Sequence, residues 1–170
     1  MTTLLSLVDE EKLVRHDPEL PPHIQPERLI YMHPRVPGQV DARIAGQGST
    51  HNLEIMPDEQ WDELLSSFCE GVELIYGWQF KDLLPHGDDI WELKRPDIRV
   101  FGWFQSKDCF VVTAVDAVWK LKEISGLYAS YIRQAIADRA ELVDDGSWVK
   151  GNDPNEVVSN WCEAPQEGGG

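Results

Sequence analysis

Residues 88–142 carry the strongest structural pattern of the chain, three strand-like segments followed by one helix-like segment. The first two segments, residues 90–94 and 98–104, are separated by Arg-Pro-Asp, and the third, residues 109–115, follows a short polar connection. Pro96 donates no backbone hydrogen bond and favours a turn, so it ends the first strand. Strands joined by so few residues must be antiparallel, because a parallel pair needs a long crossover. The pattern therefore predicts a meander of three adjacent strands.

Two helices are expected to pack on this meander. Residues 57–76 place their apolar side chains on one stripe, with Pro57 at the first helical position and Gly77 as the stop signal. Residues 125–142 repeat apolar side chains at three- and four-residue spacing, which gives one face able to lie on the strands. The sequence therefore predicts an α+β fold, with packed helices on an antiparallel sheet of about four strands.

Composition divides the chain into three predicted parts. Residues 1–50 contain six of the eleven prolines and are expected to form an N-terminal extension, with a short strand at 29–32. A hairpin is expected between residues 40 and 56. Residues 51–145 form the predicted α+β domain, and residues 146–170 form an acidic, glycine-rich C-terminal tail.

The acidic charge lies mostly outside the central segment. The whole chain has a formal net charge of −15, yet residues 91–141 hold eight basic and seven acidic residues. Lys94 and Arg99 belong to the first two strands, whereas Lys120 and Lys122 follow the third. Charges at one end of adjacent strands converge, and such a cluster is suited to a phosphate.

The same segment resembles the RelE/HigB-type toxins, and is most similar to their phage-derived branch. The residues WELK at 91–94 and IRVF at 98–101 are similar to that family's aromatic-Glu-Leu-Arg and Arg-Val/Ile-aromatic signatures. The run VDAVWKLK at 115–122 resembles the strand-end segment in which an aromatic residue precedes paired lysines, and residues 132–139 resemble the family's final helix. The resemblance covers residues 57–142. It implies a RelE-like fold and ribosome-dependent cleavage of mRNA, with a cognate antitoxin as partner.

The chemistry that this resemblance implies needs no metal and no cofactor. The RNA 2′-hydroxyl attacks the adjacent phosphate, so the site must supply cations around a developing dianion and a proton relay. We assign the cationic roles to four residues: Arg99 to transition-state charge, Lys94 and Lys120 to phosphate positioning, and Lys122 to either role. Tyr128 or Tyr131 is the candidate proton donor. His86 and Asp116 flank the same segment.

A second function remains open, that of a catalytically inactive RelE-like protein from a phage or mobile element. Such a protein would bind and inhibit a basic host protein, with its acidic surface acting as a nucleic-acid mimic. The net charge of −15 favours this reading, because an enzyme that approaches RNA gains affinity from positive charge. Lys94 stands where the family has arginine, and a lysine makes no rigid bidentate contact with phosphate. Trp148 and Trp161 are candidate anchors for a protein partner.

Other functional classes lack their sequence signals. The histidines and cysteines show no HExxH or CxxC spacing, and no Gly-x-Ser-x-Gly motif is present. Residues 1–7 do not resemble a signal peptide, and no apolar stretch is long enough to span a membrane. The three cysteines are odd in number and widely spaced, which indicates reduced thiols. We therefore expect a cytoplasmic protein that does not contact membranes.

Overall fold

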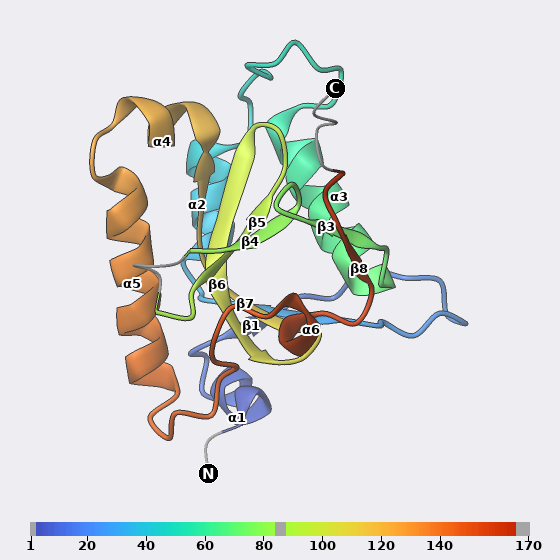
Figure 1. The fold of residues 1–170 in the computed structure, drawn as a ribbon, viewed down its shortest axis with the longest axis vertical. Helices are drawn as coiled ribbons and strands as arrows, with labels where there is room; N and C mark the ends of the chain where they lie inside the picture. The colour runs from blue at the N-terminus through green and yellow to red at the C-terminus, as the bar shows by residue number, and fades with distance from the viewer. Residues whose placement is uncertain (1–2, 84–87, 166–170) are drawn as a thin grey trace.

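A computed structural model describes residues 3–83 and 88–165, which build one mixed β-sheet with helices on both faces (Figure 1). The strands are β1 (Val14–Arg15), β2 (Leu29–Met32), β3 (Leu74–Tyr76), β4 (Phe80–Asp82), β5 (Trp91–Lys94), β6 (Ile98–Ser106), β7 (Cys109–Ala117) and β8 (Trp161–Glu163). The helices are α1 (Leu4–Asp9), α2 (Val36–Arg43), α3 (Pro57–Glu70), α4 (Val118–Glu123), α5 (Leu127–Leu142) and α6 (Pro154–Val157). The α+β class expected from the sequence is confirmed.

The predicted meander is present. Strands β5, β6 and β7 are adjacent and antiparallel, with Trp91 opposite Gly102 and Val100 opposite Val115. Helix α5 also follows the prediction closely. Helix α3 ends at Glu70, earlier than expected, because Gly71 adopts a left-handed conformation with φ of 81° and stops the helix. The residues beyond it turn back into the sheet as β3.

The predicted sheet of about four antiparallel strands is wrong in size and in type. Across the described residues the sheet has eight strands in the order β1-β2-β7-β6-β5-β4-β3-β8, and three of its pairings are parallel. Strand β2 runs parallel to β7, with Tyr31 opposite Val111. Eighty residues separate these partners in the chain, so no local turn signal announces the pairing. The strand expected at 29–32 is β2.

The hairpin expected between residues 40 and 56 is absent, and helix α2 takes its place. Pro37 lies in the first turn of α2, where a proline's missing N–H costs no hydrogen bond. Both ends of the chain enter the sheet, residues 1–50 through β1 and β2, and residues 146–170 through β8. No helix in the described ranges combines the length and apolar character needed to cross a bilayer.

Two apolar cores lie on opposite faces of the sheet. Helices α2 and α3 cover one face, where Trp61, Leu64 and Phe68 pack against strand residues such as Val100. Helix α5 covers the other face, where Ile132 packs in one cluster with Trp103. Burial on both faces explains why β6 and β7 consist of nearly continuous apolar residues rather than an alternating pattern.

Gly102 sits where the pairing of β6 and β7 shifts register. A Cβ built on Gly102 would lie 1.9 Å from the Val111 carbonyl oxygen and 2.8 Å from the Phe110 ring. Backbone atoms in a central strand pair have little room to move. Only glycine therefore fits this position in the sheet.

Substitution Gly102→Ala should lower the free energy of unfolding by about 2 kcal/mol or more, since the added methyl group forces the central strands apart. The matched control is Gly48→Ala, whose Cβ would meet no atom within 4 Å and which should stay within about 0.5 kcal/mol of the parent. Urea unfolding of the three proteins measures both changes. Equal midpoints for Gly102→Ala and the parent would show that the strands are not packed this closely.

Candidate functional site

The sheet brings three of the sequence-predicted cations to one end of its α5-covered face. The β5–β6 register sets Lys94 opposite Arg99, and the β6–β7 register sets Arg99 opposite Asp116. Helix α4 starts directly after β7, so the Lys120 ammonium lies 3.3 Å from the Asp116 carboxylate. The four residues form one row across three strands and the helix that follows.

Lys94 and Arg99 share a surface pocket of about 360 Å³, whose lining is Trp78, Gln79, Lys94, Arg95, Pro96 and Arg99. The Lys94 ammonium donates a hydrogen bond of 3.0 Å to the Gly77 carbonyl. The Arg99 guanidinium donates to the carbonyls of Arg95 and Ile98. In the described part of the chain, neither cation has a carboxylate oxygen within 4.0 Å.

Both cations are partly withdrawn from water. Burial lowers the pKa of Lys94, and the nearby charge of Arg99 lowers it further. Burial also lowers the pKa of Arg99, although the Glu92 carboxylate opposes that effect. Two desolvated cations without a carboxylate partner attract an anion, because an anion replaces the water that each has lost. The exposed indole of Trp78, 56% accessible, borders the same pocket.

The two lysines of α4 differ in their surroundings. Lys120 is largely neutralised by Asp116 and also lies over the Trp119 ring, 5.6 Å from its centre. Lys122 is exposed, and the described residues give it no ion-pair partner. Lys122 is therefore the more available charge for a mobile anionic chain, whereas Lys120 is held in place.

The two candidate tyrosines are bound to buried carboxylates. The Tyr128 hydroxyl donates to Glu92, and the Tyr131 hydroxyl donates to Asp116. Burial raises the pKa of both phenols, and the adjacent carboxylates raise it further. Both phenols therefore stay protonated at neutral pH. These two hydrogen bonds connect α5 to strands β5 and β7.

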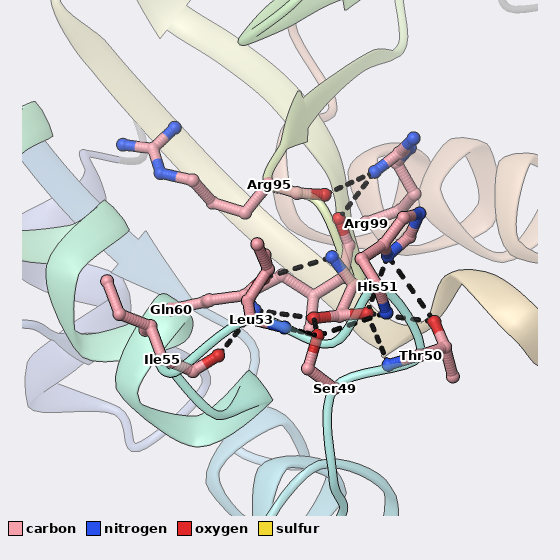
Figure 2. Close-up of polar contacts among 10 residues, drawn as sticks. Ser49, Thr50, His51, Leu53, Ile55, Gln60, Arg95 and Arg99 are labelled. Carbon is pink, nitrogen blue, oxygen red and sulfur yellow. Dashed lines mark hydrogen bonds and ion pairs between the residues drawn. The ribbon is translucent and has the colours of Figure 1, made fainter.

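A second cluster, which the sequence did not reveal, centres on the buried carboxylate of Asp97, and its partners Ser49, Thr50, His51 and Gln60 are labelled in Figure 2. Its Oδ1 accepts from the Thr50 amide at 3.0 Å, the Thr50 hydroxyl at 2.9 Å and His51 Nδ1 at 2.9 Å. Its Oδ2 accepts from Ser49 at 2.7 Å and from the Gln60 amide at 2.6 Å. The backbone amide of Asp97 donates in return to the Gln60 side chain. We refer to Asp97 and the segment 49–51 as the Asp97 cluster.

Hydrogen bonds keep this carboxylate ionised. Burial alone would raise the pKa of Asp97, but the donors on His51, Ser49, Gln60 and Thr50 outweigh burial and hold the pKa well below its usual range. An ionised carboxylate only accepts hydrogen bonds, so His51 must carry its proton on Nδ1. The other ring nitrogen, Nε2, has no hydrogen-bond partner among the described residues, and the His51 side chain is 47% exposed.

The two clusters share one turn of the chain. Asp97 follows Pro96, which lines the cation pocket, and Arg99 donates to the carbonyls on either side of that turn. The carbonyl of Asp97 also accepts from the Val118 amide at the start of α4. No sequence signal links residues 49–51 to Asp97, because 46 residues separate His51 from its partner. His86, noted above, lies outside the described residues.

Comparison with family models, with curated proteins and with solved structures found no match to this chain. The described residues contain no group of three His, Cys, Asp or Glu side chains arranged to hold a metal ion. The cation pocket and the Asp97 cluster are therefore the two candidate functional sites of the described residues.

Replacing Asp97 with asparagine should lower the free energy of unfolding at pH 7 by about 1–3 kcal/mol, since several buried donors lose a charged acceptor. The folded-state pKa of Asp97 is depressed, so its stabilisation is complete above the unfolded pKa of about 4 and is lost as the pH falls. The difference in the free energy of unfolding between the parent and Asp97→Asn should therefore become smaller below about pH 4. Urea unfolding at several pH values measures this difference, with the exposed Asp144→Asn as control. A difference that does not change with pH would contradict the ionised state of Asp97.

Proposed function

We propose that this chain is a RelE/HigB-like toxin that binds mRNA on the ribosome and cleaves it without a metal ion. The observation that supports this proposal most is the pairing of Lys94 and Arg99 in one pocket with no carboxylate partner among the described residues. Holding two half-buried cations without a carboxylate partner costs stability, so a ligand anion is the natural occupant. The resemblance of residues 57–142 supplies the reaction class, and a cognate antitoxin belongs to the same proposal.

The chemistry of RNA fits the lining of the pocket. A phosphodiester that passes through a five-coordinate transition state gains negative charge, which fixed cations stabilise better than water does. Arg99 is anchored by two carbonyl oxygens, so its guanidinium is oriented before the substrate arrives. Lys94 is the neighbouring charge that positions the phosphate. The exposed Trp78 ring offers a stacking surface for an unpaired base.

The helix α4 extends the same surface. Lys122 is suited to a neighbouring phosphate, whereas Lys120 forms an ion pair with Asp116. The net charge of −15 weakens non-specific attraction to nucleic acid, so binding depends on this local site and on the ribosomal complex. A toxin of this kind acts on mRNA that is bound to the ribosome rather than on free RNA.

Induced expression of the parent chain should arrest bacterial growth and leave cut mRNA, and Arg99→Ala should relieve the arrest. Loss of a preorganised cation at the reacting phosphate should slow cleavage by about 10²-fold or more. Primer extension on ribosome-bound mRNA measures the cut sites and the rate. The matched control is Arg133→Ala, an exposed arginine on α5 that should leave both unchanged. Harmless expression of the parent with intact mRNA would end the proposal.

A second candidate function, inhibition of a basic host protein, is favoured by a different surface. A groove of about 380 Å³ between β1, α2 and α3 is lined by apolar side chains such as Val14 and Val40, by the three aspartates Asp17, Asp41 and Asp62, and by Arg15 and His16. Three carboxylates against one arginine leave this partly apolar lining with an excess of negative charge, which suits a basic, amphipathic partner.

Pull-down from bacterial lysate, run beside the cleavage assay, separates the two functions. Recovery of ribosomes together with cut mRNA would favour the toxin. Recovery of one stoichiometric basic protein, retained by Arg99→Ala, lost on Asp41→Lys with Asp62→Lys and lost at high salt, would favour the inhibitor. The two surfaces share no lining residue, so each variant reports on one function only.

A further inference from the structure

Transesterification of RNA requires a base for the 2′-hydroxyl, and the cation pocket does not contain one. Lys94 and Arg99 are protonated at neutral pH. Tyr128 and Tyr131 donate their hydroxyls to Glu92 and Asp116, and their raised pKa values keep them protonated. A proton acceptor must therefore come from a neighbouring part of the fold.

His51 has the arrangement of such an acceptor. Its Nδ1 lies 2.9 Å from Asp97 Oδ1, and the ionised carboxylate fixes the proton on Nδ1. The Nε2 atom has no hydrogen-bond partner among the described residues, and the side chain is 47% exposed. A buried carboxylate that orients an accessible imidazole is the geometry by which histidine accepts a proton.

The partner of this imidazole, Asp97, belongs to the same turn as residues that line the cation pocket. Arg95 and Pro96 line the pocket, and Asp97 is the next residue of the same turn. The Arg99 guanidinium is bonded to the carbonyls of Arg95 and Ile98, which bracket Asp97. Figure 2 shows the side chains of His51 and Arg99 extending toward the same side of this turn, away from that of Arg95.

We propose that His51 is the general base of the RNA cleavage and that Asp97 is its positioning residue. This inference rests on the function proposed above. His51 Nε2 takes the proton of the 2′-hydroxyl while the 2′-oxygen forms a bond to phosphorus and the bond to the 5′-oxygen breaks. The leaving 5′-oxygen takes a proton from water, and His51 returns its proton to solvent. The products are a 2′,3′-cyclic phosphate and a 5′-hydroxyl.

The charged groups around His51 set the direction of the pH dependence. Asp97 is the charged group in direct contact with the imidazole, and Arg99 is the cation anchored on the same turn. A general base must be neutral to act. The cleavage rate of the parent should therefore rise with pH and then level off, as in other reactions that need a general base.

The test is single-turnover cleavage of ribosome-bound mRNA by the full chain, from about pH 5.5 to pH 8.5, which spans the usual titration range of histidine. His51→Gln keeps a side-chain N–H for Asp97 but provides no base. It should lose about 10²–10⁴-fold in rate together with the pH-dependent rise, while ribosome binding stays unchanged. The matched control is His23→Gln, an exposed histidine whose side chain makes no hydrogen bond within residues 3–83 and 88–165. Its profile should match that of the parent.

Chemical rescue separates catalysis from a purely structural role of the Asp97 cluster. Imidazole added to His51→Ala should restore part of the cleavage, because a free base can occupy the space that the side chain left. A parent that cleaves, combined with a His51→Gln profile that keeps the same rise and the same rate, would overturn this inference alone. Loss of activity in His51→Ala without rescue, accompanied by a lowered unfolding temperature, would also overturn it. A parent that does not cleave RNA would overturn the proposed function and this inference together.

Discussion

The carboxylate of Asp97 is the point on which the candidate site depends. The carboxylate joins the loop 49–51, the first turn of α3 through Gln60 and the β5–β6 turn. The backbone carbonyl of Asp97 accepts a hydrogen bond from the Val118 amide, the first of α4. A buried charge is stable only when several donors surround it, and here five hydrogen bonds do so. Asp97 therefore links four segments, three through its ionised carboxylate and α4 through its backbone carbonyl.

The carboxylates on the α5 face of the sheet do not neutralise all of its cations. On the α5 face, the buried carboxylates Glu92 and Asp116 each accept a hydrogen bond from a tyrosine, and Asp116 also pairs with Lys120 at 3.3 Å and with Arg43 at 4.0 Å. A hydroxyl donor stabilises a carboxylate without consuming a cation, so Lys94 and Arg99 stay available for a ligand. The same tyrosines pack on Phe101, with ring centres 5.1 and 5.4 Å away, which makes the polar pairs part of the core.

Local patterns were sufficient for the centre of the fold. The meander of β5, β6 and β7 follows from short connections, and α3 and α5 follow from apolar spacing, because these signals lie within a few residues of each other. The same locality explains the errors. The parallel pairing of β2 with β7 leaves no turn signature. The proline and glycine of α2 predict a break in the helix, whereas Pro37 lies in its first turn, where a proline is tolerated.

The sequence by itself determined the central strands, the helix that covers them and the concentration of basic residues at one end of the meander. Cross-strand register then follows from the short turns, which is why Lys94 and Arg99 were expected together and lie together. Only the tertiary structure decided that both tyrosines are bound to carboxylates and that His51 reaches Asp97. These contacts join residues 15 to 46 positions apart, and packing of separate elements, rather than any local preference, brings such residues together.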